Sequence, residues 1–172
     1  MLIRAYGLFW RADEIDWTPG AGRSADGVRR FALLGRRRIN TPGLRLADFR
    51  EQRGIYILYG NYGPYYVGVT VERGLGTRLK EHLGDAHQGE WDRFSWFGFR
   101  RVLAPRRPSP LGELAEFALG KYVDQGTMIM ELEALLINAM ALRNIRRTRF
   151  PAGERWEQVR LDERAHFLGK LA

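Results

Sequence analysis

The stretch between residues 75 and 133 carries three side chains whose types suit chemistry on a phosphate ester. Arg78 and His82 are four residues apart where leucines recur every fourth position, so a helix would place both on one face. An arginine grips phosphate with two donors, and a histidine can accept a proton near neutral pH. Glu133, in a later helical stretch, can hold a divalent cation whose other ligands are water and phosphate oxygens. Cleaving a phosphodiester needs a nucleophile, relief of negative charge on the phosphorus and help for the leaving oxygen, and groups of these kinds can serve those needs.

Two tyrosines lie upstream in a predicted β-hairpin. Residues 54–59 and 65–70 are rich in β-branched and aromatic residues, and the turn formers of 60–64 separate them. Tyr56 and Tyr66 are therefore expected on adjacent strands, where their hydroxyls can join a proton transfer or hold water. Taken alone, each tyrosine is more simply a strand aromatic that packs in the core.

The order of these residues resembles the GIY-YIG nuclease family. Gly54-Ile55-Tyr56 on one strand and Tyr66-Val67-Gly68 on the next match its two motifs at the usual spacing. The family then has an arginine on the next helix, a histidine one turn on, a glutamate in a Glu-x-x-x-Ile context and an asparagine. The matching residues here, which complete the expected catalytic set with Tyr56 and Tyr66, are Arg78, His82, Glu133 (with Ile137) and Asn144. The resemblance covers roughly residues 52–145.

The resemblance implies a metal-dependent DNA endonuclease that leaves 5′-phosphate and 3′-hydroxyl ends. Arg78 would then stabilise the scissile phosphate, and Glu133 would bind Mg²⁺ or Mn²⁺. Tyr56 would act as general base or orient the attacking water, with His82 exchanging its proton. A free tyrosine has a pKa of about 10, so Tyr56 needs a nearby cation to work near neutrality. Tyr66 would hold water or phosphate by its hydroxyl.

Three positions depart from the family pattern. Val69 stands where some members have a lysine, which shifts proton handling towards His82. Glu131 competes with Glu133 as metal ligand, although only Glu133 has the isoleucine at the family spacing. Asn144 comes one residue early and lacks a preceding proline, so Asn138 remains a rival.

The predicted fold class is α+β, with a small central antiparallel three-stranded sheet flanked by helices and a short N-terminal β extension. The two hairpin strands and a strand over residues 94–103 would form the sheet, and a strand over residues 3–10 would extend it. Leucine spacing predicts helices over residues 75–83 and 111–119.

The strongest helical pattern runs from about residue 128 to 142, and residues 44–49 suit one or two helical turns. We expect an N-terminal extension packed on the domain over residues 1–50 and, as the resemblance implies, a nuclease core over residues 51–145. A partly helical tail would follow over residues 146–172.

Composition restricts the kinds of site and compartment. The 172 residues include no cysteine, which excludes disulfides and cysteine–zinc sites, and three histidines, which disfavour a histidine-rich metal site. The hydrophobic fraction of 45% and charged fraction of 28% are typical of a globular protein. No apolar run is long enough for a membrane helix, and the N-terminus lacks the features of a signal peptide. We expect a cytoplasmic protein without a membrane partner.

The net charge of +8 favours a polyanionic partner, here DNA. Solvated surface is the simpler interpretation of each basic cluster. The candidate DNA contacts are Arg36, Arg37, Arg38, Lys80, Arg100, Arg101, Arg106 and Arg107, with a further group at Arg143, Arg146, Arg147 and Arg149. The aromatic group at Trp91, Phe94, Trp96, Phe97 and Phe99 is more simply core than a platform for stacked bases.

Two other functions fit the same residues. The chain could be a nucleic-acid-binding module on a nuclease scaffold, or a structure-specific repair nuclease or toxin that needs a partner. Among active nucleases, a restriction-like or standalone enzyme fits the small additions around the motif. Either a monomer or a homodimer is compatible with the sequence.

Overall fold

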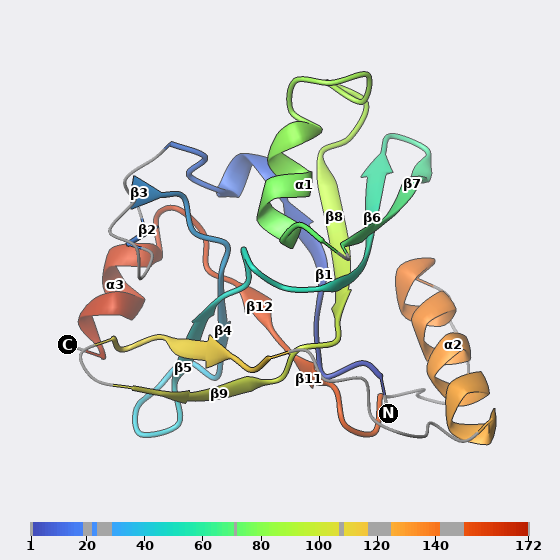
Figure 1. Cartoon of the computed structure of the whole chain (residues 1–172). Helices are drawn as coiled ribbons and strands as arrows, with labels where there is room; N and C mark the ends of the chain where they lie inside the picture. The colour runs from blue at the N-terminus through green and yellow to red at the C-terminus, as the bar shows by residue number, and fades with distance from the viewer. Residues whose placement is uncertain are drawn as a thin grey trace.

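Two five-stranded sheets form the body of the protein (Figure 1). The computed structural model describes residues 2–18, 22–23, 29–70, 72–106, 109–116, 125–141 and 150–171. The first sheet has the order β11-β1-β8-β6-β7, and the second has the order β12-β4-β5-β10-β9. The first sheet comprises β1 (Ala5–Arg11), β6 (Gly54–Gly60), β7 (Gly63–Thr70), β8 (Arg93–Gly98) and β11 (Glu154–Arg155).

The second sheet consists of shorter strands. They are β4 (Leu34–Arg37), β5 (Arg45–Asp48), β9 (Val102–Pro105), β10 (Gly112–Leu114) and β12 (Glu157–Gln158). A separate pair is formed by β2 (Gly22–Arg23) and β3 (Arg29–Arg30). The helical elements are α1 (Leu75–Glu81), α2 (Gln125–Ala139), α3 (Arg164–Gly169) and the 3-10 turn η1 (Ala12–Glu14).

The predicted small three-stranded antiparallel sheet flanked by helices is wrong. Both sheets are mixed, because β1 pairs in parallel with β11 and β5 pairs in parallel with β10. Segments expected outside the sheet supply several of the strands. Residues 44–49 contain β5 instead of helical turns, and residues 111–119 contain β10 where a helix was expected.

The single strand expected over residues 94–103 is two strands that belong to different sheets. Gln52, which is buried, holds the chain between β8 and β9. Its side-chain Oε1 accepts the Arg100 N–H at 3.0 Å, and its Nε2 donates to the Arg100 carbonyl at 3.0 Å. A Cβ at Gly98 would lie 2.3 Å from the Gln52 side chain, so glycine is needed at this bend.

Other local predictions are confirmed. The β6–β7 hairpin is antiparallel with Tyr56 opposite Gly68, and α1 begins at Leu75 as expected. The N-terminal strand β1 lies inside the first sheet, between β8 and β11. The tail contains the short helix α3. In the described part of the chain, no helix is long and apolar enough to cross a membrane.

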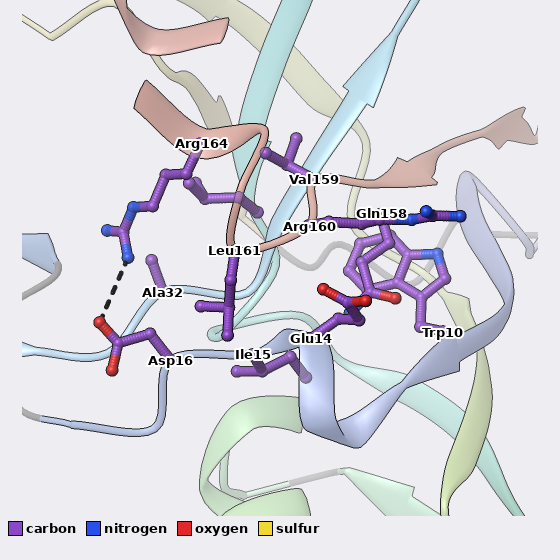
Figure 2. Close-up of a pocket in the computed structure, with 11 residues that line it drawn as sticks. Trp10, Glu14, Ile15, Asp16, Ala32, Gln158, Val159, Arg160, Leu161 and Arg164 are labelled. Atoms are coloured by element: carbon purple, nitrogen blue, oxygen red, sulfur yellow. Dashed lines mark ion pairs between the residues drawn. The ribbon is translucent and has the colours of Figure 1, made fainter. Parts of the chain in front are cut away.

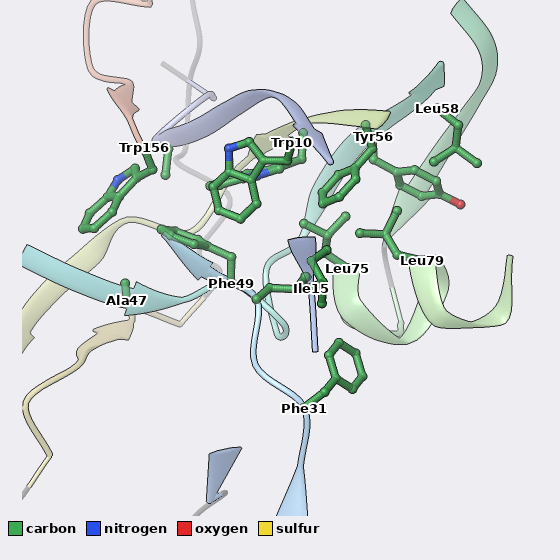
Figure 3. Close-up of a cluster of buried hydrophobic side chains, with 14 of the residues drawn as sticks. Trp10, Ile15, Phe31, Ala47, Phe49, Tyr56, Leu58, Leu75, Leu79 and Trp156 are labelled. Carbon is green, nitrogen blue, oxygen red and sulfur yellow. The ribbon is translucent and has the colours of Figure 1, made fainter. Parts of the chain in front are cut away.

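Alternation along β6 separates the two faces of the first sheet. Tyr56 and Leu58 pack with Leu75 and Leu79 of α1 (Figure 3). Their neighbours Ile57 and Tyr59 pack in another cluster with Ala134 and Ala139 of α2. Successive side chains of a strand point to opposite faces, so α1 and α2 cover opposite faces of this sheet.

Aromatic side chains fill the space between the two sheets. Phe49, which follows β5, is fully buried and lies 4.4 Å from Trp96 of β8 between ring centroids. Trp156 stands where the chain passes from β11 to β12, and its ring lies 5.1 Å from that of Phe49. Trp10 of β1 meets Phe49 edge-on at 6.0 Å. Phe49 therefore joins the sheets through contacts with three tryptophans.

We expect Phe49→Ala to lower the free energy of unfolding by about 3–5 kcal/mol, because it leaves a cavity between the sheets. Urea denaturation followed by tryptophan fluorescence measures the change. Leu132→Ala, at an exposed position of α2, is the control and should change stability by no more than about 0.5 kcal/mol. Equal stability losses in the two variants would contradict the role of Phe49.

Candidate active site

Four of the residues predicted from the sequence come together beside α1. Tyr56 projects from β6 and Tyr66 from β7, while Arg78 lies on α1 and His82 directly follows its last residue. The Tyr56 hydroxyl lies 2.7 Å from Nε2 of His82. The ring of Tyr66 lies 6.2 Å from that of Tyr56 and 5.2 Å from that of His82. Arg78 also interacts with the Tyr56 hydroxyl.

The glycine of the second motif makes room for the tyrosine of the first. Gly68 is the direct partner of Tyr56 across the β6–β7 ladder. A Cβ at Gly68 would lie 2.2 Å from both Cζ and the hydroxyl oxygen of Tyr56. The Tyr56 ring therefore lies flat over Gly68, and this position directs its hydroxyl to His82.

Asp85 is a member of the cluster that the sequence analysis missed. Its Oδ2 lies 2.7 Å from Nδ1 of His82, and its Oδ1 accepts the backbone N–H of His87 at 2.8 Å. That backbone hydrogen bond lowers the pKa of Asp85, so the carboxylate stays charged at neutral pH. The spacing His-x-x-Asp after a helix is the available signal, but it is too common to single out one residue.

Asp85 sets the tautomer of His82. A carboxylate accepts hydrogen bonds, so Nδ1 of neutral His82 carries the proton and Nε2 accepts one from the Tyr56 hydroxyl. The His82 ring is nearly fully buried, and its carbonyl accepts the Trp91 indole N–H at 3.2 Å. The result is a chain of hydrogen bonds from Tyr56 through His82 to Asp85.

Burial keeps Tyr56 protonated. It raises the pKa of the Tyr56 hydroxyl to about 12, although the Arg78 charge acts in the opposite direction. At neutral pH this tyrosine is a hydrogen-bond donor and not a phenolate. Tyr66 and Arg78 are only partly buried, so they are the residues beside the Tyr56 hydroxyl that solvent reaches.

Arg78 is held by a second unpredicted residue. The Glu81 carboxylate accepts Nη1 of Arg78 at 2.6 Å and Nη1 of Arg73 at 2.5 Å. The pKa of Glu81 is lowered by these two guanidinium groups despite its partial burial. Two arginines share one carboxylate, so a net positive charge remains beside the tyrosines.

The structure does not bring the predicted metal ligand into this cluster. Glu133 is exposed on α2, the helix that covers the opposite face of the first sheet. Glu131 is buried, and its carboxylate accepts the backbone N–H groups of Leu2, at 2.7 Å, and Ile3, at 3.3 Å. Glu131 thus anchors the N-terminal segment, whereas Glu133 keeps its carboxylate in solvent.

Asn138 and Asn144 are the two asparagines predicted as candidates for the site. Asn138 donates its side-chain N–H to the Ala134 carbonyl at 2.7 Å, one turn back in α2. That bond belongs to the helix itself. Asn144 lies outside the described residues, as do Arg107, Arg143, Arg146, Arg147 and Arg149.

Several predicted DNA contacts have structural partners. Arg36 pairs with Glu157 at 2.7 Å, Arg37 pairs with Glu154, and Arg100 donates to the carbonyls of Glu51, Leu114 and Ala115. Lys80 donates to the Trp17 carbonyl at 3.3 Å and lies over the Phe31 ring. Arg38, Arg101 and Arg106 are exposed, with Arg106 only 3.8 Å from Glu113.

One small hollow lies away from these residues. It is lined by Trp10, Ile15, Leu161 and others, and the ion pair between Asp16 and Arg164, at 3.8 Å, borders it (Figure 2). Its volume of about 10 Å³ has room for one water molecule at most. This hollow is a packing defect and not a ligand site.

One group of side chains in the described part of the chain has the composition of a metal site. His82, Asp85 and His87 each offer a ligand atom, and these atoms lie within 4.8 Å of one another. The sequence analysis disfavoured a histidine site because only three histidines are present. The turn after α1 nevertheless brings two of them together.

Comparisons of the chain with protein-family models, curated proteins and solved structures found no match.

Replacing Gly68 by alanine should displace the Tyr56 ring and break its hydrogen bond to His82. We expect the free energy of unfolding to fall by about 1–3 kcal/mol, because the added methyl overlaps a buried ring. Chemical denaturation measures this loss. Gly84→Ala is the matched control, since a Cβ at Gly84 meets nothing within 4 Å. The packing argument is wrong if both alanine variants are equally stable.

Tyr56 should ionise at about pH 12, above the ordinary tyrosine value. The difference in tyrosinate absorbance between wild type and Tyr56→Phe, recorded with EDTA, isolates this titration. Above about pH 10 an unfolded Tyr56 releases a proton that the folded protein still holds, so stability falls as pH rises towards 12. Tyr56→Phe should flatten that fall. A difference titration centred at about pH 10 would contradict the burial effect.

Proposed function

We propose that this protein is a metal-dependent DNA endonuclease of the GIY-YIG type. It would hydrolyse phosphodiester bonds to give 5′-phosphate and 3′-hydroxyl ends, and act in the cytoplasm as a monomer or homodimer. The observation that carries the proposal is the Tyr56–His82 hydrogen bond, with Arg78 and Tyr66 beside it. A purely structural tyrosine has no need of a histidine, a carboxylate and an arginine around its hydroxyl.

The partly exposed residues would meet the substrate. Arg78 lies beside the tyrosines and has a planar fork that suits a phosphate with two free oxygens. Tyr66 would hold the attacking water, because Tyr56 is fully buried and Tyr66 is not. Tyr56 interacts with Tyr66 on one side and with His82 on the other.

The proton of the attacking water would pass inward along this chain. Tyr66 would take it as it gives its own proton to Tyr56, and Tyr56 would in turn give a proton to His82. His82 would then be positively charged and paired with Asp85 at 2.7 Å, which stabilises the charge. His82 thus serves as the proton acceptor, and the raised pKa of Tyr56 is no obstacle because Tyr56 is never left as a phenolate.

The proposed cofactor is Mg²⁺ or Mn²⁺, which would supply charge stabilisation for the phosphate. Glu133, the ligand expected from the sequence, does not fit this role at the tyrosine cluster, because its helix α2 covers the opposite face of the first sheet from Tyr56 and α1.

A nucleic-acid-binding module is the second candidate. One observation favours it: Glu133 stands on the helix that covers the opposite face from Tyr56. Such a module would bind DNA through exposed arginines, including Arg38, Arg101 and Arg106, without cutting it. A structure-specific repair nuclease that needs a partner would use the same residues as the main proposal.

The proposed activity is tested with supercoiled plasmid in Mg²⁺ or Mn²⁺. We expect wild type to nick the plasmid. Arg78→Gln should be slower by at least about 100-fold, because it removes a positive charge that stabilises the negatively charged transition state. Glu133→Gln, on the opposite face of the first sheet, should cut at nearly the wild-type rate. Arg160→Gln, at an exposed arginine of the tail, should keep the wild-type rate. Ligation of the products tests for 5′-phosphate ends.

Two outcomes decide between the candidates. Cleavage that survives undiminished in Arg78→Gln would reject the assigned site. A gel shift of DNA by wild type that is unchanged in Arg78→Gln, without cleavage of linear, branched or flapped DNA, favours the binding module.

A further inference from the structure

The turn after α1 adds a second imidazole, that of His87, to the His82–Asp85 pair of the proposed site. We propose that His82, Asp85 and His87 bind a divalent transition metal, with zinc as the best fit. Their ligand atoms lie within 4.8 Å of one another. The site shares His82 and Asp85 with the proposed proton relay, so zinc there would take Nε2 of His82 out of the relay, but zinc binding itself does not depend on nuclease activity.

The His82 ring is oriented like that of a metal ligand. Nδ1 faces Asp85 at 2.7 Å, and Nε2 lies 2.7 Å from the Tyr56 hydroxyl. Metal-binding histidines usually place the other ring nitrogen in a hydrogen bond that fixes the ring. The Trp91 indole at the His82 carbonyl and the burial of the ring keep it in this position.

His87 has a corresponding arrangement. The Tyr65 hydroxyl lies 3.1 Å from its Nδ1, which leaves Nε2 to act as a ligand. The His87 and His82 rings are 4.9 Å apart between centroids and nearly perpendicular. The bond from the His87 backbone N–H to Asp85 closes the turn, so the two histidines are held near each other before metal arrives.

The ligand types select the metal. Zinc accepts imidazole and carboxylate together, whereas Mg²⁺ and Ca²⁺ prefer oxygen ligands only. Bond lengths of about 2.0–2.2 Å in a tetrahedron separate two ligand atoms by about 3.4 Å. The Asp85 side chain is 40% exposed, so a small rotation can widen its contact with His82 enough to admit the ion. Water would complete the coordination.

Binding would reverse the proton arrangement at His82. A metal on Nδ1 of the neutral ring leaves the proton on Nε2, which then donates to the Tyr56 oxygen. The change of tautomer can be observed at Nδ1 of His82 without any measurement of nuclease activity.

Isothermal calorimetry with zinc chloride, on the full chain stripped of metal and without DNA, tests the site. We expect one zinc per chain, and affinity reduced at least about tenfold in His87→Ala and in Asp85→Asn. His166→Ala, at an exposed histidine on α3, should bind as wild type does. Magnesium chloride in the same cell should not displace the zinc.

Nitrogen-15 NMR of the histidine rings supplies the second measurement. Zinc should shift Nδ1 of His82 and Nε2 of His87 and leave His166 unchanged. The proposal is overturned if wild type binds no zinc at micromolar concentrations, or if His87→Ala and His166→Ala bind equally well. Plasmid cleavage is not part of this test, so the nuclease proposal can fail while the zinc site stands.

Discussion

The pairing of Tyr56 with Gly68 across the β6–β7 hairpin is the constraint on which the candidate site depends. No side chain other than glycine leaves room for the tyrosine ring, because a Cβ would lie 2.2 Å from its hydroxyl oxygen. The ring has to lie along the sheet and reach the end of α1. The tyrosine of the first motif and the glycine of the second therefore have one steric cause, and the hydroxyl position follows from strand register and not from flexible packing.

The first sheet positions this hairpin through its connections to the second. The chain passes between the sheets several times, among them from β5 to β6, from β8 to β9 and from β11 to β12. Gln52, between β5 and β6, fixes the β8–β9 passage by two hydrogen bonds to the backbone of Arg100, and Trp156 fills the β11–β12 passage. The hairpin and α1 are attached to a body whose core is aromatic, which limits how far the tyrosines can move.

The sequence predicts local features well because their causes are local. The alternation of aromatic and β-branched residues around Tyr56, and leucines four apart after Leu75, require only neighbouring residues. The second sheet was missed because strands such as Leu34–Arg37 are four residues or shorter and pair with distant segments. Leucine spacing also suggested a helix where Gly112–Leu114 joins β5 and β9 instead, since pairing outweighs local preference.

The same distinction holds within the site. Tyr56, Tyr66, Arg78 and His82 were found because a motif fixes their order, and the structure brings them together. Their partners have no such pattern. Glu81 and Asp85 were missed because a carboxylate three residues after a basic side chain is a common surface arrangement. Glu81 and Asp85 matter because the hairpin places Tyr56 and Tyr66 beside their basic partners. That placement depends on tertiary structure and cannot be read from local sequence.

Those two carboxylates decide what the predicted residues can do. Without Asp85, His82 would have no acceptor for its Nδ1 proton, and Nε2 would not be committed to accepting from Tyr56. Without Glu81, Arg78 would be held only by a neutral hydroxyl, and the two positive charges of Arg73 and Arg78 would repel each other. Burial alone leaves Tyr56 a weak acid. The proton-accepting ability of the cluster therefore resides in the pairing of His82 with Asp85, outside the two motifs that drew attention to it.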